Sequence, residues 1–265
     1  MNRTFYFISG MPRAGSTLLA NLLAQNPRFE CSATSGILEV IVSIRNGWDK
    51  LDEFRAAPND TAKMNVMRGV LEGFYATSDR PVAFDKSRGW IAYLEMAEAM
   101  LGRTAKVLVP VRDIRDILAS FETLRRANSA LRQTGGESAH FHDYQSIEGR
   151  CETLLRPDQP AGLAYARIRD ALLRGFRDRL HFVHFERLTA QPQQTMQEIY
   201  QFLGETPFAH DFQNVKQVTA ENDAIYGYAD LHTIRPKIEP VPSRAKQVLG
   251  PAFDRYPGPY LWNQV

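Results

Sequence analysis

Short apolar runs alternate with longer segments of helical periodicity along this chain. The apolar runs are rich in β-branched and aromatic residues, and four of them predict buried strands: Thr4–Ser9, Arg80–Ser87, Ala105–Asp113 and Leu180–Phe185. Apolar positions three and four residues apart predict the intervening helices: Ser16–Gln25, Trp90–Leu101, Ile114–Ala127, about Ala161–Asp178, and Gln193–Leu203. Strands that alternate with helices are typical of an α/β protein with a parallel sheet covered by helices.

Two stretches lack this pattern. Asn128–Pro160 has weak periodicity and predicts an inserted loop or lid, and the proline-rich tail Thr233–Val265 predicts irregular structure. Neither stretch divides the chain into two cores, so we expect one domain over residues 1–265. Ligands of parallel sheets bind beyond the carboxyl ends of the strands. That rule brings together Gly10–Thr17, Asp85–Arg88 and Arg112–Asp113 at one edge.

Composition excludes several classes of protein. A chain of 265 residues with 44% hydrophobic residues and a net charge of +2 does not indicate a nucleic-acid binder. No run has the length of a membrane span, and Phe5–Ile8 is too short for a signal peptide. Cys31 and Cys151 have no metal or redox spacing, which favours a reducing, cytoplasmic location. His140 and His142 lack a third ligand at a recognisable spacing, so no metal site is expected.

The loop after the first predicted strand has the features of an anion site. Gly10 and Gly15 have the spacing of a nucleotide-binding P-loop, but Ser16 stands where that motif has lysine. The helix that follows directs free N–H groups at the loop, and Ser16, Thr17 and Arg13 add hydroxyls and a cation. The alternative is a strand–turn–helix joint with capping hydroxyls.

The loop sequence "SGMPRAGST" resembles the 5′-phosphosulfate-binding loop of sulfotransferases that use 3′-phosphoadenosine-5′-phosphosulfate (PAPS). The resemblance implies a three-layer α/β/α fold of the P-loop NTPase type, with a central parallel sheet. It also implies that no metal takes part and that Arg13 supplies the cation for the leaving phosphate. The residues that it assigns to the donor are Pro12, Arg13, Ala14, Gly15, Ser16 and Thr17.

Two later segments resemble the same family. Arg112 at a strand end and Ser120 eight residues on resemble its 3′-phosphate motif, where a guanidinium fork and a hydroxyl meet a dianion. The alternative pairs Arg112 with a neighbouring aspartate. "LHTIRPKI" resembles the basic segment that folds over the 3′-phosphate, which implies roles for Arg235 and Lys237. Phe185 stands where relatives often have a tyrosine near the adenine.

The general base and the acceptor contacts are less clearly marked. "DKSR" at the second predicted strand's end offers Asp85 as the base and Lys86 as the cation on the bridging oxygen, while an Asp85–Arg88 salt bridge is the alternative. Relatives that sulfate protein tyrosines carry a glutamate shortly after the first helix. That stretch has no acid here, although Glu39 follows it. Candidate acceptor contacts are Glu39, Arg88 and His142.

The leading hypothesis is a sulfotransferase that moves a sulfuryl group from PAPS to a hydroxyl or amine and releases 3′-phosphoadenosine-5′-phosphate (PAP). The acceptor could be a small molecule, a carbohydrate or a peptide, and the sequence sets neither its identity nor the oligomeric state. A P-loop kinase or NTPase is the first alternative, which Ser16 argues against. A non-catalytic PAP- or nucleotide-binding protein is the second.

Overall fold

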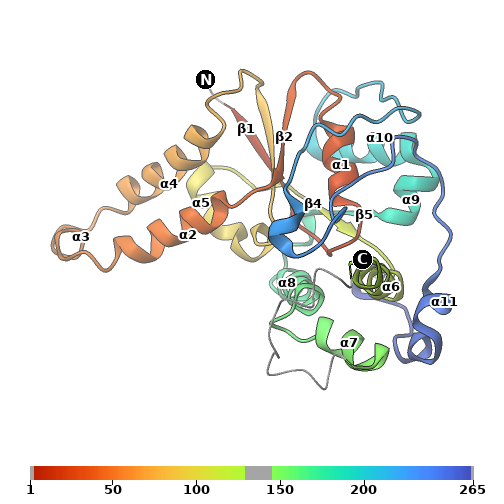
Figure 1. Ribbon diagram of the computed structural model, residues 1–265. Coiled ribbons are helices and arrows are strands. Elements are labelled where there is room, and N and C mark those ends of the chain that lie inside the picture. Colours follow the sequence, from red (N-terminus) through yellow and green to blue (C-terminus); the bar gives the residue numbers. More distant parts are fainter. Residues whose placement is uncertain (1–2, 129–144, 264–265) are drawn as a thin grey trace.

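The computed structural model describes residues 3–128 and 145–263. Within these ranges a central sheet of five parallel strands has the order β2-β3-β1-β4-β5 (Figure 1). The strands are β1 (Thr4–Ile8), β2 (Phe29–Thr34), β3 (Val82–Lys86), β4 (Val107–Val111) and β5 (Leu180–His184). The four strands predicted from the sequence are present. The edge strand β2 was not predicted, because half-polar "FECSAT" lacks a continuous apolar run.

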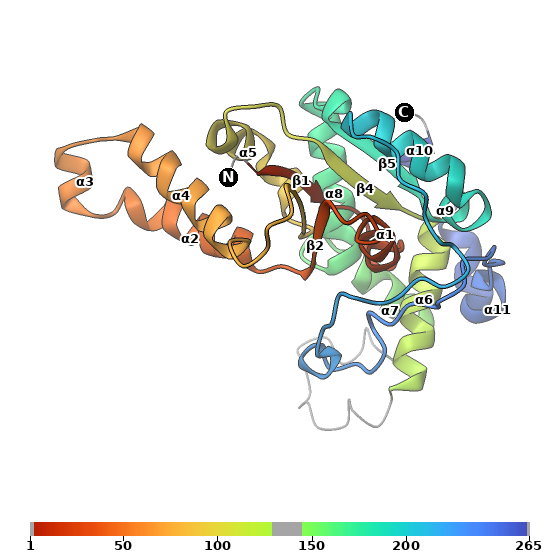
Figure 2. The same ribbon diagram turned by 90° about the horizontal axis from the view of Figure 1, so that it is seen from above.

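Helices cover both faces of the sheet, because successive side chains of the strands point to opposite sides. In β1, Phe5 and Phe7 belong to one core, while Tyr6 and Ile8 belong to the other. The second core is covered by α1 (Ser16–Leu23), α9 (Phe185–Ala190) and α10 (Pro192–Leu203), and the first by α5 (Leu94–Leu101), α6 (Ile114–Ala127) and α8 (Pro160–Leu173) (Figures 1 and 2). The predicted three-layer α/β/α fold is confirmed. None of the described helices is long and apolar enough to cross a bilayer.

The segment between β2 and β3 forms a helical arm that extends away from the sheet (Figure 1). It consists of α2 (Ile37–Trp48), the short α3 (Asp52–Ala56) at its tip and α4 (Asp60–Phe74). An ion pair between Lys63 Nζ and Asp49 Oδ2 at 2.6 Å joins α4 to the end of α2. The sequence pattern did not predict this arm.

Helices also occupy the two stretches that were predicted without regular structure. α7 (Ile147–Leu154) lies inside the predicted insertion, and Arg150 Nε on it donates to Glu122 Oε2 of α6 at 2.8 Å. In the tail, α11 (Ala245–Leu249) packs on α6, and Trp262 is buried. The prediction of an irregular tail is therefore wrong for this part. Short 3₁₀ helices include η1 (Trp90–Tyr93), η4 (Arg177–Arg179), η6 (Gly250–Arg255) and η7 (Leu261–Asn263).

A long loop, residues 212–238, crosses over α1 at the carboxyl edge of the sheet (Figure 2). Its two ends lie side by side, where Ile238 N donates to Phe212 O at 2.9 Å. Asn21 on α1 holds the crossing, because its Oδ1 accepts two backbone N–H groups of the loop at 2.6 and 3.1 Å. The tip is the 3₁₀ turn η5 (Asp223–Tyr226). This covering loop forms one wall of the cavity described next.

Candidate active site

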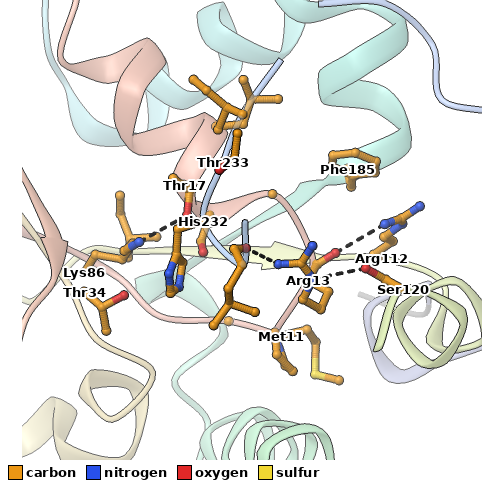
Figure 3. A pocket seen from close by; sticks show the side chains of 18 of the residues that line it. Met11, Arg13, Thr17, Thr34, Lys86, Arg112, Ser120, Phe185, His232 and Thr233 are labelled. Carbon is orange, nitrogen blue, oxygen red and sulfur yellow. Dashed lines mark hydrogen bonds between the residues drawn. The ribbon is translucent and has the colours of Figure 1, made fainter. Parts of the chain in front are cut away.

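A cavity of about 540 Å³ opens at the carboxyl ends of β1, β3 and β4 (Figure 3). β1 lies in the middle of the sheet, and the chain moves to opposite sides of it to form β3 and β4. Parallel sheets bind ligands at such a reversal of strand order. The volume is in the range of small-molecule and cofactor sites.

The loop Gly10–Thr17 forms the floor of this cavity and needs both of its glycines. A Cβ at Gly10 would lie 2.3 Å from the carbonyl oxygen of Pro110, because β1 and β4 approach closely there. Gly15 has a φ of +81°, and a Cβ on it would lie 2.6 Å from Cδ2 of Phe185. Within the described chain, no side chain caps the start of α1. The first N–H groups of this helix are therefore available to an anion.

Arg13, Arg112 and Ser120 meet on the β4 side of the cavity (Figure 3). Arg13 Nε donates to Ser120 Oγ at 3.0 Å, and its NH1 donates to the carbonyl of Leu231 in the covering loop. Arg112 NH1 lies 3.4 Å from the carbonyl oxygen of Arg13, and its guanidinium stacks 4.4 Å from the ring centroid of Phe185. Burial and the neighbouring charge of Arg112 lower the pKa of Arg13. The sequence assigned Arg13 to the 5′-phosphosulfate and Arg112 with Ser120 to the 3′-phosphate, but in the structure these three residues lie together.

Lys86 contacts the loop where α1 begins. Its Nζ lies 3.2 Å from Thr17 Oγ1 and 2.9 Å from Glu221 Oε1 in the covering loop (Figure 3 draws the bond to Thr17). Glu221 also accepts both the backbone N–H and the hydroxyl of Thr34 at 2.9 Å. Burial lowers the pKa of Lys86, although Glu221 opposes this effect. Burial raises the pKa of Glu221, but the charge of Lys86 and the bonds from Lys86 and Thr34 outweigh this and lower it.

A histidine and an aspartate of the covering loop form a second pair. His232 Nδ1 lies 2.6 Å from Asp223 Oδ1 and 3.3 Å from Glu221 Oε2, and its ring lines the cavity (Figure 3). Both neighbours of Nδ1 are carboxylates, which can only accept when ionised, so Nδ1 carries a proton. In the neutral ring Nε2 is then free to accept one. This arrangement is that of a histidine general base oriented by a carboxylate.

Asp85 does not have the position that the base role requires. It is fully buried and does not line the cavity. Its two carboxylate oxygens accept from Trp90 Nε1 at 2.6 Å and from the Tyr75 hydroxyl at 2.7 Å, inside the core on the other side of β3. Burial raises its pKa, while these hydrogen bonds oppose the shift. Asp85 also makes no ion pair with Arg88 in the described structure. The salt bridge that was the alternative interpretation of "DKSR" is therefore not present either.

The other predicted residues divide into those at the cavity and those away from it. Pro12, Ser16, Arg88, Arg235 and Lys237 line it. Ala14 packs into the core, so only its backbone faces the loop. Glu39 is exposed on α2 outside the cavity lining, which does not suit a base or an acceptor contact. His142 lies outside the described residues.

Sequence reasoning missed the three polar residues of the covering loop. Glu221, Asp223 and His232 belong to no recognisable motif, and only the resemblance of "LHTIRPKI" drew attention to this region. Lys86 and Glu221 are 135 positions apart, so no local spacing could have joined them. Over residues 3–128 and 145–263, no group of three or more His, Cys, Asp or Glu side chains has the arrangement of a metal site.

The sequence pattern of the sulfotransferase family matches residues 6–210. Among curated proteins, none matches significantly. Similar solved structures include sulfotransferase STF9 from Mycobacterium avium, with 14% identity and a TM-score of 0.49, over 79% of this chain and 66% of that one. The sulfotransferase domain of the Synechococcus PCC 7002 olefin synthase has 18% identity and a TM-score of 0.48, over 97% of both chains.

The family match covers most of the chain, including the loop Gly10–Thr17 and the Arg112–Ser120 motif. It confirms the family that the loop and this motif predicted from sequence, and the chain belongs to the sulfotransferase family.

Proposed function

We propose that this protein transfers a sulfuryl group from PAPS to a hydroxyl or amine of an acceptor. The observation that carries the proposal is the presence of two anion-binding sets in one cavity. One is the loop Gly10–Thr17 with Lys86, and the other is Arg112 with Arg13 and Ser120. A nucleotide with phosphates at both its 3′ and 5′ positions requires two such sets, whereas ATP requires only one.

The second set has an unmet hydrogen-bonding need that a phosphate would fill. Arg112 Nε is buried and has no partner among the described residues. A buried donor without an acceptor is costly, and a phosphate oxygen beside Ser120 would remove that cost. We therefore assign Arg112, Ser120 and Arg13 to the 3′-phosphate. Arg235 and Lys237 line the same cavity; Arg235 adds positive charge, whereas Lys237 pairs with Glu239 at 3.4 Å.

The first set is assigned to the 5′-phosphosulfate. The N–H groups at the start of α1, the hydroxyls of Ser16 and Thr17 and the ammonium of Lys86 would surround the phosphate that leaves. This differs from the sequence prediction, which gave the leaving phosphate to Arg13. The reason is that the Arg13 side chain turns to Ser120, while Lys86 reaches Thr17.

The transfer then needs only positioning and one proton acceptor. The acceptor oxygen forms a bond to sulfur while the bond from sulfur to the 5′-phosphate oxygen breaks, and the electron pair goes to that oxygen. Lys86 stabilises the charge that develops there. His232 Nε2 takes the proton of the acceptor hydroxyl, and Asp223 holds the ring in orientation and stabilises its protonated form.

The kinase alternative has less support. Thr17 occupies the position of the P-loop Ser or Thr that serves Mg²⁺ in NTPases. Here its hydroxyl contacts the ammonium of Lys86, so a protein cation stands beside the group that would hold the metal. The absence of a metal requirement remains a prediction, which a chelator control tests.

Calorimetric titration with PAP, and with ATP in the presence and absence of Mg²⁺, tests the donor site. We expect PAP to bind in EDTA, and Arg112→Ala to weaken binding more than about tenfold, because a charge-assisted contact is lost. Arg126→Ala, on α6 with Ser120 but outside the cavity lining, is the control and should bind normally. Binding of Mg²⁺–ATP without binding of PAP would support a kinase instead.

The proposed base is tested separately. His232→Gln should lower kcat by about 10²- to 10⁴-fold and leave PAP affinity unchanged. Asp223→Asn should give a smaller loss of kcat. Normal turnover by His232→Gln would require another base. PAP binding without transfer to any compound of a broad acceptor panel would favour a non-catalytic binding protein.

A further inference from the structure

The cavity continues past Lys86, away from the proposed 3′-phosphate contacts. Its lining there includes Ser87, Arg88 and Tyr226. Ser87 and Arg88 follow β3, on the opposite side of β1 from β4 and Arg112. If the donor spans from Arg112 to Lys86, this end of the cavity receives the acceptor.

Arg88 is one of several cavity cations, with Arg13, Arg112 and Arg235, that pair with none of the described carboxylates. Among the described residues, its guanidinium has no ion pair or hydrogen bond, whereas Lys86 pairs with Glu221 and Arg13 bonds Ser120. The carboxylate nearest in sequence, Asp85, is committed to Trp90 and Tyr75 inside the core. Arg88 therefore does not serve to neutralise a protein carboxylate.

A second cation lies beside it and increases the local positive charge. Arg167 of α8 donates from NH1 to the carbonyl of Arg88 at 3.1 Å, and none of the described carboxylates pairs with it. Partial loss of water lowers the pKa of Arg88, and the charge of Arg167 lowers it further. Arg167 thus places a second positive charge near Arg88, and a bound anion would relieve the repulsion between them.

We infer that the acceptor carries an anionic group, a carboxylate or a phosphate, which binds Arg88 while the acceptor's hydroxyl faces Lys86 and His232. The planar guanidinium fork of Arg88 suits either oxyanion in a bidentate contact, and Arg167 adds positive charge nearby. Tyr226, on the tip of the covering loop, lines the same end of the cavity and contacts the neutral part of the acceptor. The inference rests on the proposed function, since it assumes that the donor occupies the Arg112 side.

The experiment titrates the PAP-saturated protein with matched probes: 4-(hydroxymethyl)benzoate, its methyl ester, and 4-(hydroxymethyl)phenyl phosphate. We expect either anion to bind at least about tenfold more tightly than the ester, as one charge-assisted contact provides. The two anionic probes distinguish a carboxylate from a phosphate. Arg88→Gln should abolish the discrimination and leave PAP affinity unchanged. Arg169→Gln, an exposed arginine of α8 outside the cavity lining, is the control and should retain it.

Two outcomes would overturn the inference. One is equal behaviour of acid and ester, including binding of neither, and the other is full discrimination by Arg88→Gln. The PAP titration separates this failure from failure of the proposed function. Normal PAP binding with no preference for anions would refute only the anionic acceptor, whereas loss of PAP binding would refute the donor assignment itself.

Discussion

Asp85 and Lys86 are neighbours in β3, but their side chains lie on opposite faces of the sheet. Asp85 enters the core next to Trp90 and Tyr75, and Lys86 reaches the P-loop-like floor of the cavity. Because successive side chains of a β-strand point to opposite faces, the carboxylate of Asp85 has a structural role while the ammonium of Lys86 lies at the site. Sequence alone could place both residues at the carboxyl edge, but it could not say which one faces the ligand.

Two variants of Asp85 distinguish a structural from a catalytic role. Asp85→Ala leaves two buried donors, Trp90 Nε1 and the Tyr75 hydroxyl, without acceptors, and we expect a loss of about 2–5 kcal/mol in the free energy of unfolding. Asp85→Asn retains an oxygen for Trp90 and should stay folded and active. Denaturant unfolding and kcat of the two variants check this. A folded Asp85→Asn protein without activity would restore Asp85 as the base.

Lys86 sets the alkaline limit of activity in this scheme. Burial lowers its pKa, so Lys86 should lose its proton, and the enzyme its activity, at a pH below that of an ordinary lysine. Glu221 raises the pKa of Lys86, so Glu221→Gln should move the alkaline limb of the kcat profile to still lower pH. An alkaline limb that does not move in this variant would mean that another group titrates there.

At the scale of elements, the turn between β1 and α1 depends on Gly15 in two independent ways. Its positive φ strains any residue with a Cβ by about 1–2 kcal/mol, and that Cβ would also strike the ring of Phe185. Gly15→Ala should therefore weaken PAP binding. Adding Phe185→Leu should recover part of the loss, because it removes the collision but not the strain, with Phe185→Leu alone as the reference for calorimetry. If adding Phe185→Leu recovers none of the lost PAP affinity, the whole loss comes from backbone strain at position 15.

The elements that sequence predicted correctly are those with a strong apolar pattern. β1, β4 and the helix α6 are examples, since each is apolar on the face or faces that it buries. β2 was not predicted because it is a half-polar edge strand. α7 was not predicted because it is held to α6 by the ion pair of Arg150 with Glu122 and has no long row of apolar residues. Polar contacts made in three dimensions leave little trace in a hydrophobic pattern.

At the scale of the whole molecule, the loop that forms the floor of the cavity could be predicted from the sequence, but the wall formed by the covering loop could not. The loop Gly10–Thr17 and the Arg112–Ser120 pair are each encoded by residues close in sequence. The covering loop reaches the same cavity from far along the chain, as the 198 positions between Asn21 and Thr219 illustrate. Its carboxylates and His232 acquire their roles only when the loop crosses α1.

The covering loop touches both ends of the cavity with one continuous piece of chain. Its Leu231 carbonyl binds Arg13 on the donor side, and Tyr226 at its tip lines the acceptor side. A donor that engages Arg13 therefore also fixes the wall against which the acceptor rests. We expect a compulsory order of addition, in which PAPS enters first and PAP leaves last. Product inhibition by PAP should then be competitive against PAPS and noncompetitive against the acceptor, whereas a random mechanism would show that the two ends of the loop move independently.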